Sequence, residues 1–105
     1  MKYKLSTRFQ KEFKAVVDYI HEEFGKQAAL DFAENAQRKL LWVIENPTIG
    51  HIEPLLQTHQ TEIRSVIIGR HNKAIYYIEG ETLFVTDLWD MRMEPNSLAR
   101  RIRKK

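Results

Sequence analysis

The sequence predicts an α+β fold of two layers, in which a helical hairpin packs on one face of a small, mainly antiparallel sheet. Three observations support this prediction. Two apolar stripes with helical spacing fill the first half of the chain, three runs rich in β-forming residues fill the second half, and the joints within each group are short. Because helices and strands are grouped along the chain, the pattern favours an α+β fold.

The first stripe follows a weakly alternating segment, residues 1–5, which we interpret as a short strand. The stretch STRFQ indicates a helix start, and Thr7 with Gln10 three residues later fits a capping box. The apolar positions of this helix, spaced by three and four, are Phe9, Phe13, Val16, Val17, Ile20 and Phe24. Gly25 directly after them is a typical C-terminal stop.

A second stripe begins at once, so the second helix should run antiparallel to the first. Its apolar positions are Ala29, Phe32, Ala33, Ala36, Leu40, Val43 and Ile44. Asn46 and Pro47 should end it, because a residue before proline avoids helical geometry. The two stripes and the sheet predict one core, which should contain Phe13, Val17, Phe32, Ala36 and Leu40.

Residues 47–61 hold two prolines and a glycine, and we interpret them as a loop. The β-rich runs that follow are residues 62–68, 74–79 and 82–88. The short joints GRHNK and EGE predict antiparallel hairpins and complete a β-α-α-β-β-β order. Strict alternation would place Leu83, Val85, Asp87 and Trp89 on one face of the last strand.

Composition narrows the class of protein. With 105 residues, 43% of them hydrophobic and 30% charged, the chain is expected to form one domain over residues 1–105. It has no cysteine, which excludes disulfides and thiolate sites, and its histidines lack the spacing of a metal-binding motif, so we expect no metal and no cofactor. We also expect no membrane span, no secretory signal and a cytoplasmic location.

The net charge of +3 is concentrated in the final segment ARRIRKK, which contains Arg100, Arg101 and Arg103. A basic tail of this kind is typical of a chain that meets an acidic protein segment or a nucleic acid. A solvated chain end is the alternative interpretation.

Polar residues within the predicted strands are the first candidates for a site. Arg64 lies among apolar residues, and two interpretations stay open: an edge residue with its head in water, or a site residue. Trp89 near the end of the last strand is interpreted first as core. Asp90 either pairs with Arg92 or Arg64, or starts the turn.

Several of these features together resemble a known family. The order of elements, the loop segment NPTIG, the run EIRSVIIGRHNKAIYYIEGETLFVTDLWDMRMEP and the arginine after the last strand are similar to the RelE/ParE toxin superfamily. These are the bacterial toxins of type II toxin–antitoxin pairs, also known as plasmid stabilisation proteins. The ending DMRMEP resembles the Arg-x-x-Pro ending common in the ParE branch.

The resemblance implies two functions. RelE-type toxins cleave messenger RNA on the ribosome without a metal, and Arg64 and Arg92 match the two family arginine positions, which makes them the catalytic candidates of a nuclease. No tyrosine or histidine follows Arg92, however, and in that branch such a residue handles a proton. ParE-type toxins inhibit DNA gyrase by binding. This departure favours the ParE branch, with the RelE-type nuclease as the alternative. A third interpretation is a small module that only binds its antitoxin.

From the resemblance we therefore expect a toxin that binds a target such as DNA gyrase, or the ribosome and messenger RNA in the alternative, and that a cognate antitoxin neutralises. The expected target-binding residues are Arg64, Arg70, Lys73, Trp89 and Arg92. The basic tail, with Arg100, Arg101 and Arg103, is expected to bind the antitoxin or a nucleic acid.

Overall fold

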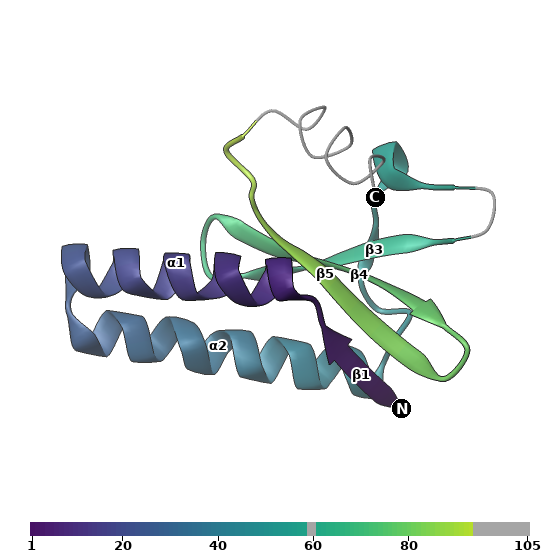
Figure 1. Cartoon of the computed structure of the whole chain (residues 1–105), viewed down its shortest axis with the longest axis horizontal. Helices are drawn as coiled ribbons and strands as arrows, with labels where there is room; N and C mark the ends of the chain where they lie inside the picture. Colours follow the sequence, from purple (N-terminus) through teal and green to yellow (C-terminus); the bar gives the residue numbers. More distant parts are fainter. Residues whose placement is uncertain (59–60, 94–105) are drawn as a thin grey trace.

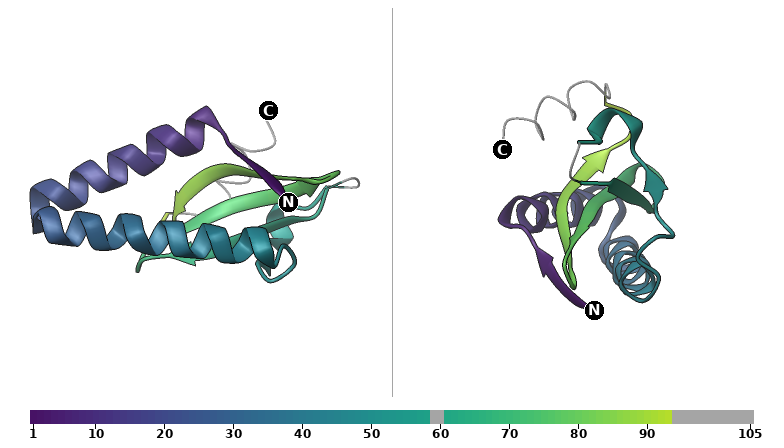
Figure 2. Two further views of the ribbon diagram at one scale, coloured as in Figure 1. Left: turned by 90° about the horizontal axis from the view of Figure 1, so that it is seen from below. Right: turned by 90° about the vertical axis from the view of Figure 1, so that its right-hand side faces the viewer.

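The computed structural model describes residues 1–58 and 61–93. Its elements are β1 (Lys2–Leu5), α1 (Thr7–Phe24), α2 (Lys26–Glu45), β2 (His51–Ile52), the 3-10 helix η1 (Pro54–Leu56), β3 (Ile63–Ile68), β4 (Asn72–Glu79) and β5 (Thr82–Asp90). The predicted α+β fold is confirmed. A helical hairpin lies against a five-stranded sheet of order β1-β5-β4-β3-β2, in which β1 is parallel to β5 and the other pairs are antiparallel (Figures 1 and 2).

The segment interpreted as a loop contains two short elements, β2 and η1. Both are too short to leave a periodic pattern in the sequence, and contacts with β3 hold them. His51 and Ile52 pair with the middle of β3. The side-chain amide of Gln57 then continues this pairing, since it donates to the Ile63 carbonyl at 2.8 Å and accepts from the Ile63 N–H at 3.2 Å.

Helix α1 begins one residue earlier than the predicted capping box. Ser6 is the N-cap, and its Oγ accepts a hydrogen bond from the Phe9 N–H at 2.9 Å. The predicted pairing of Thr7 with Gln10 is wrong, because the Gln10 amide instead donates to the Leu5 carbonyl at 3.0 Å. Ser6 is preferred as the cap because the end of β1 fixes its extended backbone, which an N-cap requires.

Strand β5 contains a bulge that overturns the predicted alternation. Val85 pairs with Tyr76 and Asp87 pairs with Ile75, so Thr86 is one residue more than the partner strand has. An extra residue in one strand changes the face to which all later side chains point. The alternation predicted for residues 83–89 is therefore wrong beyond Val85.

The bulge distributes the last strand between two apolar clusters. Leu88 joins Leu83 and Val85 in the cluster under the helices. Trp89 lies in the smaller cluster on the opposite face, where it packs with Leu56, Ile63 and Ile75 and is 5% exposed. The interpretation of Trp89 as a core residue is confirmed.

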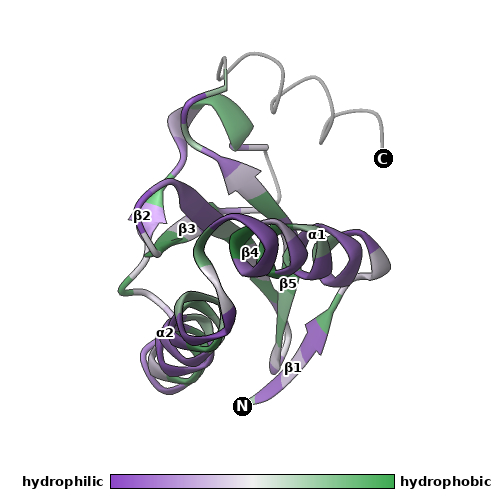
Figure 3. Ribbon diagram, turned by 90° about the vertical axis from the view of Figure 1, so that its left-hand side faces the viewer, coloured by the Kyte–Doolittle hydropathy of each residue, from purple (hydrophilic) through white to green (hydrophobic). Residues whose placement is uncertain are grey.

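The main core lies between the helical hairpin and the sheet. Phe32 and Ala36 of α2 are buried there, and Phe13, Val17 and Leu40 are half-buried and pack against it, as predicted. Figure 3 shows the hydrophobic strands β4 and β5 behind the more polar outer surfaces of the helices. In the described part of the chain, no helix has both the length and the apolar character needed to cross a membrane.

The first turns of α1 cover the edge of β5 that β1 leaves open. Strand β1 pairs only as far as Val85. Beyond it, the Ser6 hydroxyl donates to the Thr86 carbonyl at 2.6 Å, and the Glu12 carboxylate accepts from the Leu88 N–H at 3.0 Å. Side chains from the helix thus satisfy backbone groups that an open edge would expose.

Candidate functional site

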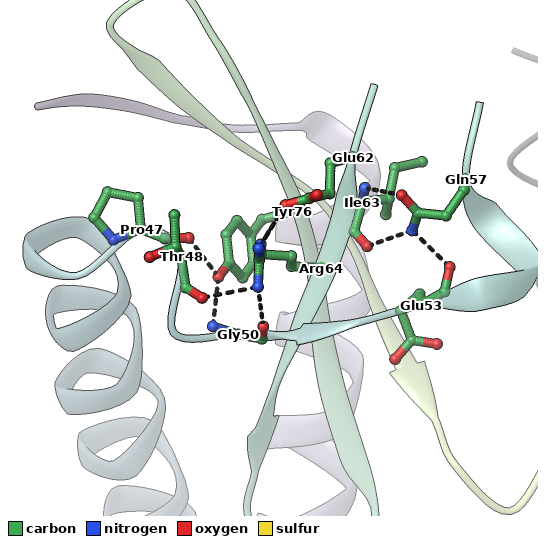
Figure 4. Close-up of polar contacts among 9 residues, drawn as sticks. All are labelled: Pro47, Thr48, Gly50, Glu53, Gln57, Glu62, Ile63, Arg64 and Tyr76. Carbon is green, nitrogen blue, oxygen red and sulfur yellow. Dashed lines mark hydrogen bonds and ion pairs between the residues drawn. The ribbon is translucent and has the colours of Figure 1, made fainter. Parts of the chain in front are cut away.

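Arg64 of β3 lies against the loop that follows α2 (Figure 4). Its Nη1 donates to the carbonyls of Thr48 and Gly50 at 2.8 and 2.7 Å, and its Nε donates to Glu62 at 2.9 Å. The side chain is 17% exposed. The interpretation of Arg64 as an edge residue with its head in water is therefore wrong, because backbone carbonyls and a carboxylate surround the guanidinium.

Tyr76 of β4 contacts the same loop (Figure 4). Its hydroxyl donates to the Pro47 carbonyl at 2.9 Å and accepts from the Gly50 N–H at 3.0 Å. Burial raises the pKa of this phenol. A Cβ at position 50 would overlap the Tyr76 hydroxyl, so this loop requires glycine at its closest approach.

Arg64 and Tyr76 are direct partners in the β3–β4 ladder. Together with Glu62 they form what we call the loop clamp, which fixes residues 47–50. The clamp explains Arg64, whose role the sequence pattern left open. The partners of Arg64 and Tyr76 in the loop are backbone groups, which the identity of the loop residues does not reveal.

Lys73 of β4 also has a partner within the protein. Its Nζ lies 2.7 Å from the Glu53 carboxylate, which also accepts from the buried Ser65 hydroxyl at 2.6 Å. The lysine and glutamate side chains are 19% and 12% exposed. Sequence reasoning placed Lys73 among the target-binding cations and missed Glu53, whose place in a loop gave no sign of this contact.

Arg92 is the most exposed of the ion-paired arginines in the described ranges, with 65% of its side chain accessible. Its Nε and Nη2 donate to the two Asp90 oxygens at 3.0 and 2.7 Å, and its backbone N–H donates to the same carboxylate at 2.9 Å. These hydrogen bonds lower the pKa of Asp90 to about 2. Of the options considered for Asp90, the structure shows two: Asp90 pairs with Arg92, and it starts the turn, since its carbonyl accepts from the Met93 N–H at 3.0 Å.

Arg70 and Arg92 lie at the same end of the sheet. Arg70 is exposed in the β3–β4 turn. The Met91 N–H donates to the His71 carbonyl at 2.6 Å, which joins this turn to the chain leaving β5. Of the five predicted target-binding residues, these two arginines are exposed, whereas Arg64 and Lys73 are bound within the protein and Trp89 is buried. The tail residues Arg100, Arg101 and Arg103 lie outside the described residues.

An apolar groove of about 530 Å³ opens between the two helices and β1. Its apolar lining residues are Tyr3, Leu5, Phe9, Phe13, Ala33, Ala36, Leu40, Leu41, Ile44 and Val85. Tyr3 and Leu41 are 55% and 50% exposed, so the groove presents apolar surface to solvent. Sequence reasoning missed it, because the groove exists only where β1 and the hairpin meet.

Residues 1–58 and 61–93 contain no group of three histidine, aspartate or glutamate side chains that could hold a metal ion. These residues instead offer the exposed side chains of Arg70 and Arg92, a fixed loop and an apolar groove, which suit contacts with other macromolecules.

Comparison with known proteins supplies the family. Residues 3–95 match the family described as the ParE toxin of the type II toxin–antitoxin system, parDE. The chain belongs to the ParE toxin family. Among solved structures it resembles the chromosomal ParDE toxin–antitoxin system from P. aeruginosa, with a TM-score of 0.68, 14% sequence identity, and coverage of 86% of this chain and 95% of that one. The search of curated proteins finds no match.

Membership of this family confirms the resemblance and makes the chain a type II toxin. The structural likeness, at 14% identity, shows that the toxin shares the fold of that system. Both helices, strands β2 to β5, the loop clamp and all of β1 except Lys2 lie within the matched residues 3–95.

Proposed function

We propose that this toxin acts in the cytoplasm as a single domain that inhibits growth by binding DNA gyrase, and that a cognate antitoxin neutralises it. The observation that carries the choice against RNA cleavage is the state of Arg64. A catalytic arginine must direct its donors at the scissile phosphate, whereas this guanidinium donates to two backbone carbonyls and to Glu62.

The sequence after Arg92 supports the same choice. The next residues are Met93, Glu94, Pro95, Asn96, Ser97 and Leu98, which include no tyrosine or histidine. The group that RelE-type toxins are expected to use for proton transfer is therefore absent from this segment. Arg70 and Arg92, which are both exposed at one end of the sheet, suit charge-assisted contacts with a target surface.

Expression in a bacterial host tests the mechanism. A gyrase-binding toxin should induce the DNA damage response and leave messenger RNA intact, and the purified protein should inhibit supercoiling by DNA gyrase. Ribosome-bound messenger RNA should stay uncut. Cleavage within codons that is lost in both Arg64→Ala and Arg92→Ala would contradict this proposal and favour a RelE-type nuclease.

We propose further that the antitoxin inserts an amphipathic helix into the apolar groove. Grooves of this kind receive helices through apolar anchors. Leu41→Glu places a charge among the apolar lining residues and should weaken antitoxin binding by at least about tenfold. Ile67→Glu is the matched control, because Ile67 is 53% exposed and does not line this groove. Equal affinities for both variants would contradict this placement.

A further inference from the structure

The turn between the two helices forms one end of the molecule (Figure 1). We call residues 18–31 the hairpin tip; it comprises the end of α1, Gly25 and the start of α2. The tip contains four carboxylates and one lysine, a formal charge of −3. Because the whole chain carries +3, the remaining residues carry +6. The tip is thus an acidic region on a basic protein.

Exposed aromatic side chains stand among these carboxylates. Phe24 is 70% exposed and Tyr19 is 57% exposed, and their rings meet edge to face with centroids 6.5 Å apart. Leu30 at the start of α2 is 46% exposed. Phe24 is the last member of the apolar stripe of α1 in the sequence, but Ile20 is the last residue of α1 that packs against the core.

An aromatic pair in water is not explained by folding. Large exposed apolar side chains that lie together mark interaction surfaces, and aromatic residues are the commonest anchors of protein interfaces. The surrounding acidic residues Asp18, Glu22, Glu23 and Asp31 are all exposed. A partner that matches this surface presents basic residues around an apolar pocket.

We propose that the hairpin tip binds a basic surface, with an apolar pocket for Phe24 and Tyr19, on the protein target of this toxin. This inference rests on the proposed function and specifies the target-facing surface. An acidic antitoxin segment would suit the basic remainder of the protein, and the tip would repel such a segment. The groove and the tip therefore serve different partners.

Two aromatic substitutions test the anchors. The double variant Tyr19→Ser/Phe24→Ser should fold normally, bind the antitoxin as the wild type does, and lose at least about tenfold in affinity for purified DNA gyrase, mainly through faster dissociation. Growth inhibition should fall with it. Ile67→Ser is the control, because Ile67 is 53% exposed but lies on β3.

Two charge reversals test the acidic surface. Glu22→Lys/Glu23→Lys should slow association with gyrase by about tenfold at low salt, and the difference should shrink as salt rises. Glu79→Lys/Glu81→Lys introduces the same change of charge at exposed positions around the β4–β5 turn. Association rates that fall equally in both variants would reveal a general charge effect and overturn the proposal.

Growth inhibition distinguishes the proposed target from the proposed role of the hairpin tip. If the wild-type toxin inhibits growth without binding gyrase, the proposed target is wrong. The tip proposal would still be supported if the aromatic variant lost growth inhibition and the Ile67→Ser control kept it. Full growth inhibition by the folded aromatic variant would overturn the tip proposal. The proposal would also fail if the wild type forms dimers, the aromatic variant does not, and the variant is still toxic. A wild type that neither binds nor inhibits would overturn both.

Discussion

At the scale of single residues, Arg64 and Tyr76 form hydrogen bonds within the protein and stabilise one of its loops. Both side chains satisfy backbone groups of residues 47–50, which have no strand or helix partner of their own there. Any effect of Arg64 on toxicity should therefore pass through the position of this loop.

Replacing Tyr76 by Phe should test the clamp. The substitution keeps the ring but removes the hydroxyl, so the buried Gly50 N–H loses its partner and the Pro47 carbonyl loses a donor. We expect the free energy of unfolding to fall by about 1–3 kcal/mol in denaturant titrations. Tyr77→Phe, on the opposite face of the same strand, is the control and should change it by less than about 0.5 kcal/mol. Equal changes in the free energy of unfolding for the two variants would show that the Tyr76 hydroxyl does not contribute to stability.

Replacing Arg92 by Ala should separate function from folding. The ion pair with Asp90 is exposed, and exposed pairs contribute little to stability, about 0–1 kcal/mol. We therefore expect a melting temperature lowered by no more than a few degrees, unchanged antitoxin binding and weaker growth inhibition. An unfolded variant would show that the arginine is a structural clamp on Asp90. A folded and fully toxic one would place the target contact elsewhere.

The pH dependence of the Asp90 carboxylate follows from the same pair. Its folded-state pKa of about 2 lies below the ordinary 3.8, so Asp90 stabilises the fold above pH 3.8, and this contribution is lost as the pH falls through 2. An NMR titration should show the low pKa of Asp90 in the wild type and a higher pKa in Arg92→Ala. A titration curve that does not move in the variant would contradict the assignment to Arg92.

At the scale of elements, the junction of β1, α1 and β5 joins the two layers. Ser6 caps the helix and donates to the Thr86 carbonyl of the bulge, so one hydroxyl serves two elements. The bulge in turn directs Leu88 toward the helices and Trp89 toward the opposite face.

Ser6→Ala should therefore destabilise the protein more than loss of a helix cap alone. We expect at least about 1–2 kcal/mol in thermal or chemical unfolding, because the cap and the bond to Thr86 are both lost. Thr7→Ala is the matched control, since Thr7 is exposed and was the expected cap. A larger loss in the Thr7 variant would contradict the assignment of Ser6.

At the scale of the whole molecule, the core between hairpin and sheet should dominate stability. Phe32 is 8% exposed, so Phe32→Ala should lower the free energy of unfolding by about 3–5 kcal/mol. Phe24→Ala makes the same change at a position that is 70% exposed and should alter it by less than about 0.5 kcal/mol. Similar losses in thermal unfolding would contradict the described packing of α2.

The sequence by itself determined the α+β class, both helices and the three longer strands, because hydrophobic periodicity and turn residues are local signals. It also identified Arg70 and Arg92 as cations beside turns, where exposure is expected. Only the tertiary structure decided which predicted target-binding cations are bound to distant groups within the protein. Arg64 donates to carbonyls 14 and 16 residues away, and Lys73 pairs with a glutamate 20 residues away. The Ser6–Thr86 bond, the bulge, the groove and the exposure of Phe24 likewise depend on where distant segments meet, which no local pattern records.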